Sequence, residues 1–431
     1  KPWVRREPVP RLILTNAKVV DPATSSVLPG VHTVITKDGH VSAVVPGEYA
    51  YELSQDEKTV PPVEVDLAGK YICPGLVDCH VHITAVPGSK SLADMATERQ
   101  ETVWFRSTYA LREMLLRGFT TVRDTGGATK ALADAVSEGL IFGPRVIQCG
   151  RGLSQTGGHG DIGSTCCGGG HGHMIGRVCD GVPDVLKAVR EELRGGADFI
   201  KVHCGGGVAS PTDAIETVQF TAEELRAITT TCTQMGNKMT TAHAYTDAAV
   251  LHAIQNGVRA IEHGNLISKS TAYMQVKGIF LTPTLSCYGI MVRSPFEDYL
   301  PPEGKVKNEQ VMARGLDALK VADEAGVVIC YGSDLLNNLQ ALQTEEFTVR
   351  AAALPAAKVL QHATTNAAKL LRDPKLGTVS QGSYADILIL DANPLEDVRI
   401  LDYPEDHLLA VIKSGVVFSS RIAGLPTQAP H

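Results

Sequence analysis

Gly75-Leu-Val-Asp-Cys-His80-Val-His82-Ile-Thr84 is a mostly apolar run that carries two histidines one residue apart. We predict that this run is a β-strand. Residues two apart on a strand face the same side, so His80 and His82 present two imidazoles together at its end. Two neighbouring imidazoles suit a divalent metal ion. They do not make a metal site alone, so the further ligands must come from other parts of the chain.

From about Ile72 onward, short apolar runs alternate with helical stretches. The later runs cover residues 120–124, 145–148, 199–203, 239–243, 260–263, 280–283 and 327–334. The helical candidates between them cover residues 103–117, 183–195, 221–236 and 246–257, and each ends near a glycine. Repeated strand–helix units predict an α/β fold in which parallel strands close into a (β/α)8 TIM barrel. We assign this barrel to residues 74–371.

Both ends of the chain have a different, strand-rich pattern. Residues 11–20 are apolar and strand-like, and residues 31–45 predict a hairpin around an Asp-Gly turn. Strand patterns return at residues 385–391 and 408–418. We therefore predict a small composite β-sandwich beside the barrel. Residues 1–73 form its N-terminal part, and residues 372–431 form its C-terminal part and a tail.

Residues of the type that bind metals recur at the ends of the apolar runs. Barrel enzymes place their chemistry at the C-terminal ends of the strands, where the loops converge. Six such residues from five strands are therefore expected to meet. Four histidines and one carboxylate suit zinc or a similar metal. The predicted metal ligands are His80, His82, Lys201, His243, His263 and Asp334.

Lys201 needs a separate explanation, because an ammonium group has no lone pair to give to a metal. An N-carboxylated lysine solves this problem, since its carbamate is an anionic group with two oxygens that can bridge two ions. Metal binding lowers the pKa of water from about 15.7 towards about 7, which would supply a hydroxide nucleophile. Asp334 would bind a metal, accept the proton of the nucleophile and pass it to the leaving amine.

The motifs around these residues resemble those of the amidohydrolase superfamily. They extend through nearly the whole chain and occur in the same order as in that superfamily. The prolidase-like branch of Xaa-dipeptidases and carboxypeptidases is the most similar, and an ochratoxin-hydrolysing amidase is related to that branch. The matching motifs are Pro74-Gly-Leu-Val-Asp-Cys-His80-Val-His82, Phe199-Ile-Lys201-Val, Ala242-His243-Ala-Tyr245-Thr, Ile261-Glu-His263-Gly, Gly332-Ser-Asp334, Ala363-Thr-Thr-Asn-Ala-Ala-Lys369 and Gly382-Ser-Tyr-Ala-Asp-Ile-Leu-Ile-Leu-Asp391.

This resemblance implies a (β/α)8 barrel with a composite β-sandwich, a binuclear zinc centre and N6-carboxylysine at Lys201. It also implies hydrolysis of an amide next to a C-terminal carboxylate, in a homo-oligomer. The expected substrates are dipeptides, N-acyl amino acids or ochratoxin-type amides. By the same resemblance, Tyr245 would stabilise the oxyanion of the scissile carbonyl. His159, in the glycine-rich loop Ser154–Asp161, would hold the substrate carboxylate, and a structural role within this loop is the alternative. We assign a structural role to Arg123-Asp124.

Residues 164–181 depart from the rest of the chain, because they are rich in glycine, cysteine and histidine. A mobile loop that covers the substrate is one interpretation. A second, structural zinc site is the other, although the spacing matches no common zinc motif. His203 and Cys204, which follow Lys201 closely, are unusual for the branch and are expected to shape the pocket.

The composition excludes several classes of protein. The 431 residues are 44% hydrophobic and 20% charged, which is typical of a globular protein. A net charge of -7 without a basic run argues against nucleic-acid or anionic-membrane partners. No apolar run approaches the roughly 18 to 20 residues of a membrane helix. Ten cysteines without a CxxC pair favour reduced thiols and a cytoplasmic protein, but the chain begins at Lys1, so secretion stays open.

Two alternatives to the binuclear amide hydrolase remain. The first is a mononuclear deaminase or cyclic-amide hydrolase of the same superfamily, which has no use for a bridging carbamate at Lys201. The second is a non-catalytic structural relative that has lost its ligands. The complete set of six ligands argues against the second alternative, and the number of bound metal ions separates the first from our main prediction.

Overall fold

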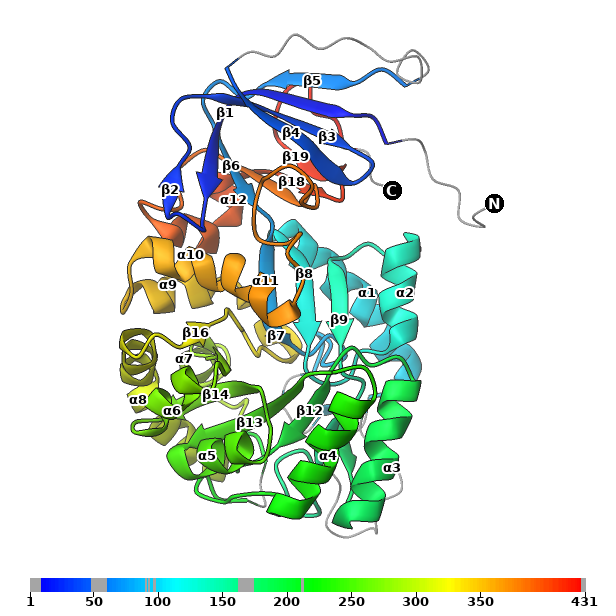
Figure 1. Ribbon diagram of the computed structural model, residues 1–431, viewed down its shortest axis with the longest axis vertical. Coiled ribbons are helices and arrows are strands. Elements are labelled where there is room, and N and C mark those ends of the chain that lie inside the picture. Colours follow the sequence, from blue (N-terminus) through cyan, green and yellow to red (C-terminus); the bar gives the residue numbers. More distant parts are fainter. Residues whose placement is uncertain are drawn as a thin grey trace.

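Parallel strands in two sheets form the middle of the molecule in a computed structural model (Figure 1). The structure describes residues 9–47, 60–89, 91, 94–95, 98–161, 174–210 and 213–427. One sheet has the order β7 (Leu76–Val81), β8 (Phe119–Asp124) and β9 (Arg145–Gln148). The other has the order β11 (Gly176–Val178), β10 (Gly152–Ser154), β12 (Ile200–His203), β13 (Thr240–Thr246), β14 (Ala260–Leu266), β15 (Phe280–Thr282) and β16 (Val328–Ile329).

Helices follow most of these strands and lie around them in Figure 1. They are α1 (Gln100–Leu116), α2 (Lys130–Glu138), α3 (Gly181–Arg194), α4 (Ala222–Gln234), α5 (Asp247–Gln255), α6 (Ser270–Val276), α7 (Ser286–Ile290), α8 (Pro302–Glu324), α9 (Glu345–Ala351), α10 (Ala356–His362) and α11 (Thr365–Leu371). Within the described part of the chain, no helix is long and apolar enough to cross a membrane.

Local sequence signals explain where these helices begin and end. Helix α4 begins with a capping box, in which the Thr221 side chain and Glu224 satisfy each other's backbone N–H groups. Helix α2 begins at the Thr129 cap and ends at Gly139, whose φ of 80° is left-handed. Four predicted helices are confirmed, with bounds that differ by one to three residues. They are α1, α3, α4 and α5, which were predicted at 103–117, 183–195, 221–236 and 246–257.

The two parallel sheets account for all of the predicted barrel strands, but their ladders do not form one continuous barrel in the described residues. Backbone hydrogen bonds nevertheless link the edges of the sheets. Cys79 N donates to Tyr331 O at 2.8 Å, Asp334 N donates to His80 O at 2.9 Å, and Asp198 N donates to Gln148 O at 2.8 Å. The α/β class with parallel strands is confirmed, and the closed barrel stays a prediction.

A nine-stranded sheet combines strands from both ends of the chain. Its main order is β19 (Val416–Ser420), β18 (Leu408–Lys413), β17 (Ile387–Leu390), β6 (Tyr71–Pro74), β1 (Leu12–Asp21), β3 (His32–Lys37) and β4 (His40–Pro46), with β2 (Ser26–Val27) and β5 (Val63–Asp66) beside β1. Strand β6 pairs in parallel with β1 and antiparallel with β17. This sheet lies at the top of Figure 1.

The nine-stranded sheet has a hydrophobic core of its own, which includes Leu12, Val34, Ile387 and Ile412. The β3–β4 hairpin turns at Asp38 and Gly39, with φ values of 50° and 76°, as its Asp-Gly signal predicts. The association of both chain ends in one sheet is therefore observed. A separate β-sandwich and the boundaries at residues 73 and 371 stay predictions.

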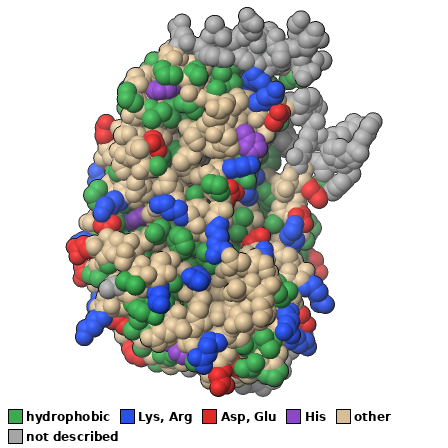
Figure 2. Space-filling view, in the orientation of Figure 1, with side chains coloured by type: hydrophobic (Ala, Val, Ile, Leu, Met, Phe, Trp, Pro, Cys, Tyr) green, Lys and Arg blue, Asp and Glu red, His purple; other side chains and the backbone are tan. Residues whose placement is uncertain are grey.

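On the face shown in Figure 2, acidic and basic side chains are interspersed.

Candidate active site

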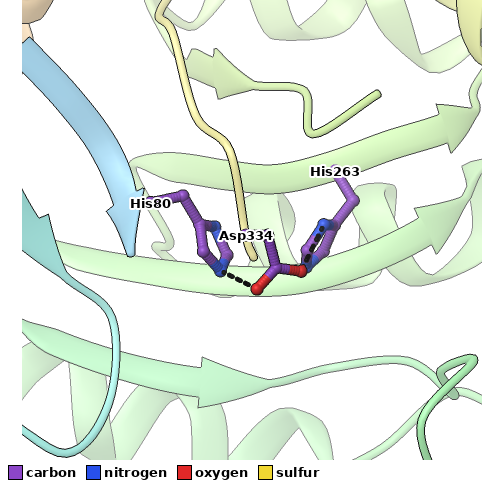
Figure 3. A group of neighbouring side chains, drawn as sticks. All are labelled: His80, His263 and Asp334. Atoms are coloured by element: carbon purple, nitrogen blue, oxygen red, sulfur yellow. Dashed lines mark ion pairs between the residues drawn. The ribbon is translucent and has the colours of Figure 1, made fainter. Parts of the chain in front are cut away.

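His80 on β7, His263 on β14 and Asp334 in the segment after β16 form a compact group (Figure 3). Their candidate ligand atoms all lie within 4.8 Å of one another. His80 Nε2 lies 3.3 Å from Asp334 Oδ1, and His263 Nδ1 lies 3.9 Å from Asp334 Oδ2. His82 reaches the same carboxylate, with its Nε2 at 3.4 Å from Oδ1. A divalent metal could be held by this group.

The two histidines of β7 are oriented by hydrogen bonds through their other ring nitrogens. His80 Nδ1 lies 2.8 Å from the Glu262 carboxylate, and His82 Nδ1 lies 2.9 Å from the Gly126 carbonyl oxygen. Both acceptors require a proton on Nδ1. Each ring therefore directs Nε2 towards Asp334, which is the arrangement that metal-binding histidines usually have.

Glu262 is a functional residue that the sequence reasoning did not single out. It is fully buried, binds His80, and accepts hydrogen bonds from Arg123 at 2.8 Å and from Thr241. Burial acts to raise the pKa of Glu262, but the charge of Arg123, the hydrogen bond and charge of His80 and the charge of Lys201 together hold the pKa well below its usual range. Glu262 is therefore an ionised acceptor that fixes the His80 ring. The only signal in the sequence was an acid beside His263 in an apolar strand.

Lys201 lies on β12 and is only 2% exposed. Burial lowers the pKa of its ammonium group, while Glu262 and Asp334 act to raise that pKa. Within the described residues, Nζ has neither a hydrogen bond nor an ion pair. A buried amine without a direct partner is unusual for lysine, because an uncompensated charge is costly away from water. This environment fits a lysine that carries another group.

His243 joins the site from β13 through ring contacts with its neighbours. Its ring lies 4.5 Å from that of His263 and 4.1 Å from that of His159, measured between centroids. Its Nε2 lies 3.0 Å from the Gly206 carbonyl oxygen, so Nδ1 is the nitrogen that can bind a metal. The parallel register aligns His243 with His203, and Thr241 with Lys201. Parallel pairing thus brings these predicted residues together.

His203, the residue that the sequence marks as unusual, lies in the same ring cluster. Its ring is 5.5 Å from that of His159 and 5.8 Å from that of His243. Its Nδ1 donates to the Leu153 carbonyl oxygen at 3.0 Å. The side chain is 8% exposed and therefore occupies space beside the predicted ligands. This position agrees with the expectation that His203 shapes the pocket.

Tyr245 is 3% exposed and lies beside the histidines on the segment that follows His243. Its ring is 5.2 Å from that of His263, and its hydroxyl accepts a hydrogen bond of 2.9 Å from Tyr288. Burial raises the pKa of Tyr245 well above its usual range, so the hydroxyl keeps its proton. A protonated phenol can donate a hydrogen bond to an oxyanion.

Two of the site residues have a left-handed backbone conformation. The φ angle is 75° at His263 and 50° at Asp334, and such values are uncommon for residues other than glycine. Asp78 holds the second of these segments in place. It accepts hydrogen bonds from Ser333 N at 3.2 Å and Ser333 Oγ at 2.6 Å, and from His80 N at 3.0 Å. Strained residues of this kind concentrate at functional sites.

Arg123 and Asp124 are both buried, but they do not form a pair with each other. Arg123 binds Glu262 and the Cys79 carbonyl oxygen, whereas Asp124 accepts backbone N–H groups, including Ile83 N at 2.7 Å. Asp124 therefore has the predicted structural role, while Arg123 supports the site through Glu262. Of the unusual stretch 164–181, residues 164–173 lie outside the described residues. The eight cysteines that the structure describes are buried and free of disulfides.

Comparisons with known proteins agree with this geometry. Residues 71–417 match the amidohydrolase family. Ochratoxinase from Aspergillus niger is 32% identical over 365 residues, which cover 80% of this chain and 75% of that protein. A prolidase structure in complex with N-methylphosphonate-L-proline is 36% identical with a TM-score of 0.89, and the match covers 95% of this chain and 100% of that chain.

A Xaa-Pro dipeptidase with methionine bound in its active site is also similar. It is 28% identical with a TM-score of 0.84, and the match covers 95% of this chain and 100% of that chain. The resemblance inferred from the motifs around His80, Lys201 and Asp334 is therefore confirmed. The chain belongs to the amidohydrolase family.

Proposed function

We propose that this protein is a metal-dependent amide hydrolase that cleaves dipeptides or N-acyl amino acids next to a C-terminal carboxylate. The observation that carries this proposal is the group of His80, His263 and Asp334, with buried Lys201 on β12 of the seven-stranded sheet. The relatives add support, because they include an ochratoxinase, a prolidase and a Xaa-Pro dipeptidase. Ochratoxin-type amides are therefore included among the candidate substrates.

The residues of the site fit a pair of zinc ions. His80 and His82 direct Nε2 towards Asp334, and imidazole with carboxylate is a ligand set that zinc prefers. We propose that Lys201 becomes N6-carboxylysine by reaction with CO2, and that this carbamate would hold the ions together with His243 and His263. When bound, the ions would supply a nucleophilic water of lowered pKa and polarise the substrate carbonyl.

The protein's own groups perform the remaining tasks in this proposal. Asp334 takes the proton of the attacking water and delivers it to the leaving amine nitrogen. Burial acts to raise the pKa of Asp334, but charge and hydrogen-bond interactions with His80, His82 and His263 hold it well below its usual range, so the group is an ionised carboxylate. Tyr245 donates its hydroxyl proton in a hydrogen bond to the oxyanion. His159 binds the carboxylate of the substrate.

We also propose that the two parallel sheets belong to one (β/α)8 barrel, with the nine-stranded sheet as part of a composite β-sandwich. The hydrogen bonds from Cys79 to Tyr331 and from Asp334 to His80 support closure between the first and last strands. A closed barrel would collect the ligands from β7, β12, β13, β14 and the segment after β16 at one end. A homo-oligomer in the cytoplasm remains part of the proposal.

The decisive test is a substrate library with metal-replete enzyme. Dipeptides, N-acyl amino acids and their C-terminal carboxamides should be compared, with release of the amine product as the readout. Cleavage confined to compounds with a free carboxylate is expected. An absence of cleavage among those compounds would reject the carboxypeptidase-like specificity.

Metal analysis of the same preparation separates the remaining alternatives. About two ions per chain are expected for a site bridged by Lys201. One ion per chain would favour the mononuclear deaminase or cyclic-amide hydrolase, and assays with those substrates would follow. A protein that binds no metal would be a structural relative instead.

A further inference from the structure

The hydroxyl of Tyr245 is bonded to a second buried phenol, that of Tyr288 in α7. Tyr288 Oη donates a hydrogen bond to Tyr245 Oη at 2.9 Å, and the two rings lie edge-to-face with centroids 6.2 Å apart. Tyr288 is 2% exposed and Tyr245 is 3% exposed. The reaction proposed above uses Tyr245 and assigns no task to Tyr288, although the two hydroxyls form one unit.

The direction of this hydrogen bond leaves the Tyr245 proton for a ligand. A phenol has one proton, and Tyr288 gives its proton to Tyr245 Oη. The proton of Tyr245 must then point away from Tyr288, because two hydroxyl protons do not fit between two oxygens 2.9 Å apart. Within the described residues, Tyr245 Oη has no other hydrogen-bond partner. This assignment involves only phenols, so it does not depend on the charge of any histidine.

Tyr288 itself is held in place through its main chain. Asn308 Nδ2 of α8 donates to Tyr288 O at 2.9 Å, and Asn308 is fully buried. At the start of α7, Glu346 accepts the N–H groups of Leu285 and Ser286 at 2.9 and 2.6 Å. The short helix α7 is thus fixed by both α8 and α9, so the Tyr288 hydroxyl has a defined position.

An apolar environment surrounds the two phenols. Both rings belong to one hydrophobic cluster, which also includes Val208, Ile290 and Leu335. A hydrogen bond is stronger in such a low-dielectric environment than in water, and a hydroxyl that accepts a hydrogen bond becomes a better donor. The bond from Tyr288 therefore polarises the Tyr245 hydroxyl as well as directing its proton.

The two phenols lie beside the proposed metal ligands. Tyr288 Oη is 3.5 Å from His263 Nδ1 and 3.4 Å from Thr284 Oγ1. The Tyr245 ring is 5.2 Å from that of His263 and 4.9 Å from that of His243, measured between centroids. In the proposed reaction the oxyanion forms next to these histidines, so a fixed hydroxyl on Tyr245 lies where it is needed.

We propose that Tyr288 is a positioning residue for hydrolysis, which directs the Tyr245 hydroxyl towards the oxyanion and strengthens it as a donor. This inference rests on the proposed function, in which Tyr245 stabilises the oxyanion. Tyr288 does not touch the substrate and acts through Tyr245 alone. Its contribution should therefore disappear when the Tyr245 hydroxyl is absent.

A double-mutant cycle with metal-replete full-length enzyme tests this dependence. Tyr245→Phe, Tyr288→Phe and the variant with both changes are assayed with an N-acyl amino acid that the wild type cleaves. Tyr245→Phe should lower kcat about 100-fold, as expected for the loss of an oxyanion donor. Tyr288→Phe should lower kcat about tenfold, the usual effect of losing one well-placed hydrogen bond. The double variant should be no slower than Tyr245→Phe, because its Tyr288 hydroxyl has nothing left to position.

A binding measurement that is independent of turnover separates positioning from general damage. Calorimetry compares an N-phosphonyl amino acid, whose phosphoryl oxygens imitate the oxyanion, with the amino-acid product, which has no such group. Tyr288→Phe should weaken binding of the phosphonate about tenfold and leave binding of the product unchanged, because the Tyr245 hydroxyl is used only by the oxyanion.

Tyr331→Phe is the matched control. It removes a fully buried hydroxyl that donates to the Gln343 carbonyl oxygen at 2.6 Å. The Tyr331 ring packs on Phe119 and Phe347 instead of on the proposed ligands. This variant should lose stability in thermal melting but keep the kcat and the phosphonate affinity of the wild type. Metal analysis establishes that each variant is loaded.

The outcomes distinguish this inference from the proposed function. The inference is overturned, and amide hydrolysis stands, if the double variant is about tenfold slower than Tyr245→Phe. The same holds if Tyr288→Phe keeps wild-type kcat, if it loses phosphonate and product binding equally, or if Tyr245→Phe keeps wild-type kcat. Should Tyr288→Phe not fold, Tyr288→Leu removes the same hydroxyl and decides by the same comparisons. A wild-type enzyme that cleaves no N-acyl amino acid overturns the proposed function, and the inference falls with it.

Discussion

Each proposed histidine ligand uses one ring nitrogen for a hydrogen bond to the protein and keeps the other for a ligand. His80 bonds a carboxylate, His82 and His243 bond backbone carbonyls, and His263 Nδ1 lies 2.8 Å from the Thr284 hydroxyl. Such partners fix the orientation of the ring, so little rearrangement accompanies metal binding. The orientation of the histidine rings in the site therefore depends on residues that would not touch the metal.

Replacement of Asp334 with Asn should lower kcat roughly a thousandfold, because the amide cannot take up the proton of the attacking water. Most of the metal should remain, since the histidines are unchanged. Steady-state kinetics and metal analysis of the purified variant provide the measurement. Asp323→Asn, which alters a carboxylate paired with Lys358 outside the site, is the control. A kcat close to that of the wild type would show that another group moves the proton.

Replacement of Glu262 with Gln should weaken metal binding about 10- to 100-fold, because His80 loses the anionic acceptor that orients it. Competition with a chromophoric chelator measures the affinity. Glu64→Gln, at an exposed position of β5, should have no effect. If the Glu262→Gln variant bound metal with unchanged affinity, Glu262 would serve only as a structural partner of Arg123.

The types and positions of the residues pointed to the six candidate ligands, of which the structure groups His80, His263 and Asp334, but they did not point to Glu262. Alternation along a strand places neighbours such as Glu262 and His263 on opposite faces. The φ angle of 75° at His263 breaks this alternation, so both side chains reach the same site. A left-handed histidine has no signature in a single sequence. Glu262 therefore became visible only when the backbone was known.

Helices with ordinary caps and strands with short apolar runs were predicted well, but the last strand of the parallel sheets was not. The run 327–334 was expected to be one strand, yet β16 covers only Val328–Ile329. Beyond it, Cys330 N still donates to Leu281 O of β15, while Tyr331 O and Asp334 N bond to the strand of His80. These bonds to the His80 strand hold Asp334 at the site, and the sequence pattern alone does not reveal them.

The buried ion pair between Glu346 and Arg350 in α9 should contribute more to the free energy of unfolding than an exposed ion pair does. Glu346 and Arg350 are both fully buried, and Glu346 also accepts N–H groups of Leu285 and Ser286, next to the Thr284 partner of His263. Glu346→Gln should lower the free energy of unfolding by about 3 kcal/mol, because Arg350 would lose its partner. Urea unfolding measures the loss.

The matched change in the exposed pair is Lys358→Gln, which removes the partner of Asp323. It should cost less than about 1 kcal/mol, because solvent already screens that pair. Similar losses in the Glu346 and Lys358 variants would contradict the importance that we assign to burial.

The molecule as a whole combines two parallel sheets, which carry the site, with a mixed sheet built from both chain ends. The sequence predicted this division, because the hydrophobic pattern changes near Ile72 and again after Leu371. It could not predict how the strand ladders meet, since that depends on long-range pairing such as Ile72 with Ile389. Such contacts have no local signal.

Removal of metal should affect the whole molecule. Since the candidate ligands come from several strands of both parallel sheets, bound metal would connect elements that are distant in sequence. Chelator treatment should abolish turnover and lower Tm by about 5 °C, and added zinc should restore both. Calorimetry with metal analysis is the measurement. An apo protein that melts like the untreated enzyme would show that the site is preformed without help from the ions.

The pairing of β6 with β17 also has a consequence for biosynthesis. Strands β1, β3, β4 and β6 leave the ribosome early, but β17 is translated only after all the strands of the parallel sheets. Until then β6 presents an open edge, which is a template for association with other chains. Nascent chains stalled before residue 387 should therefore bind chaperones strongly, and chains that extend past Ser420 should be released. Equal chaperone binding by both would show that the open edge is protected in another way.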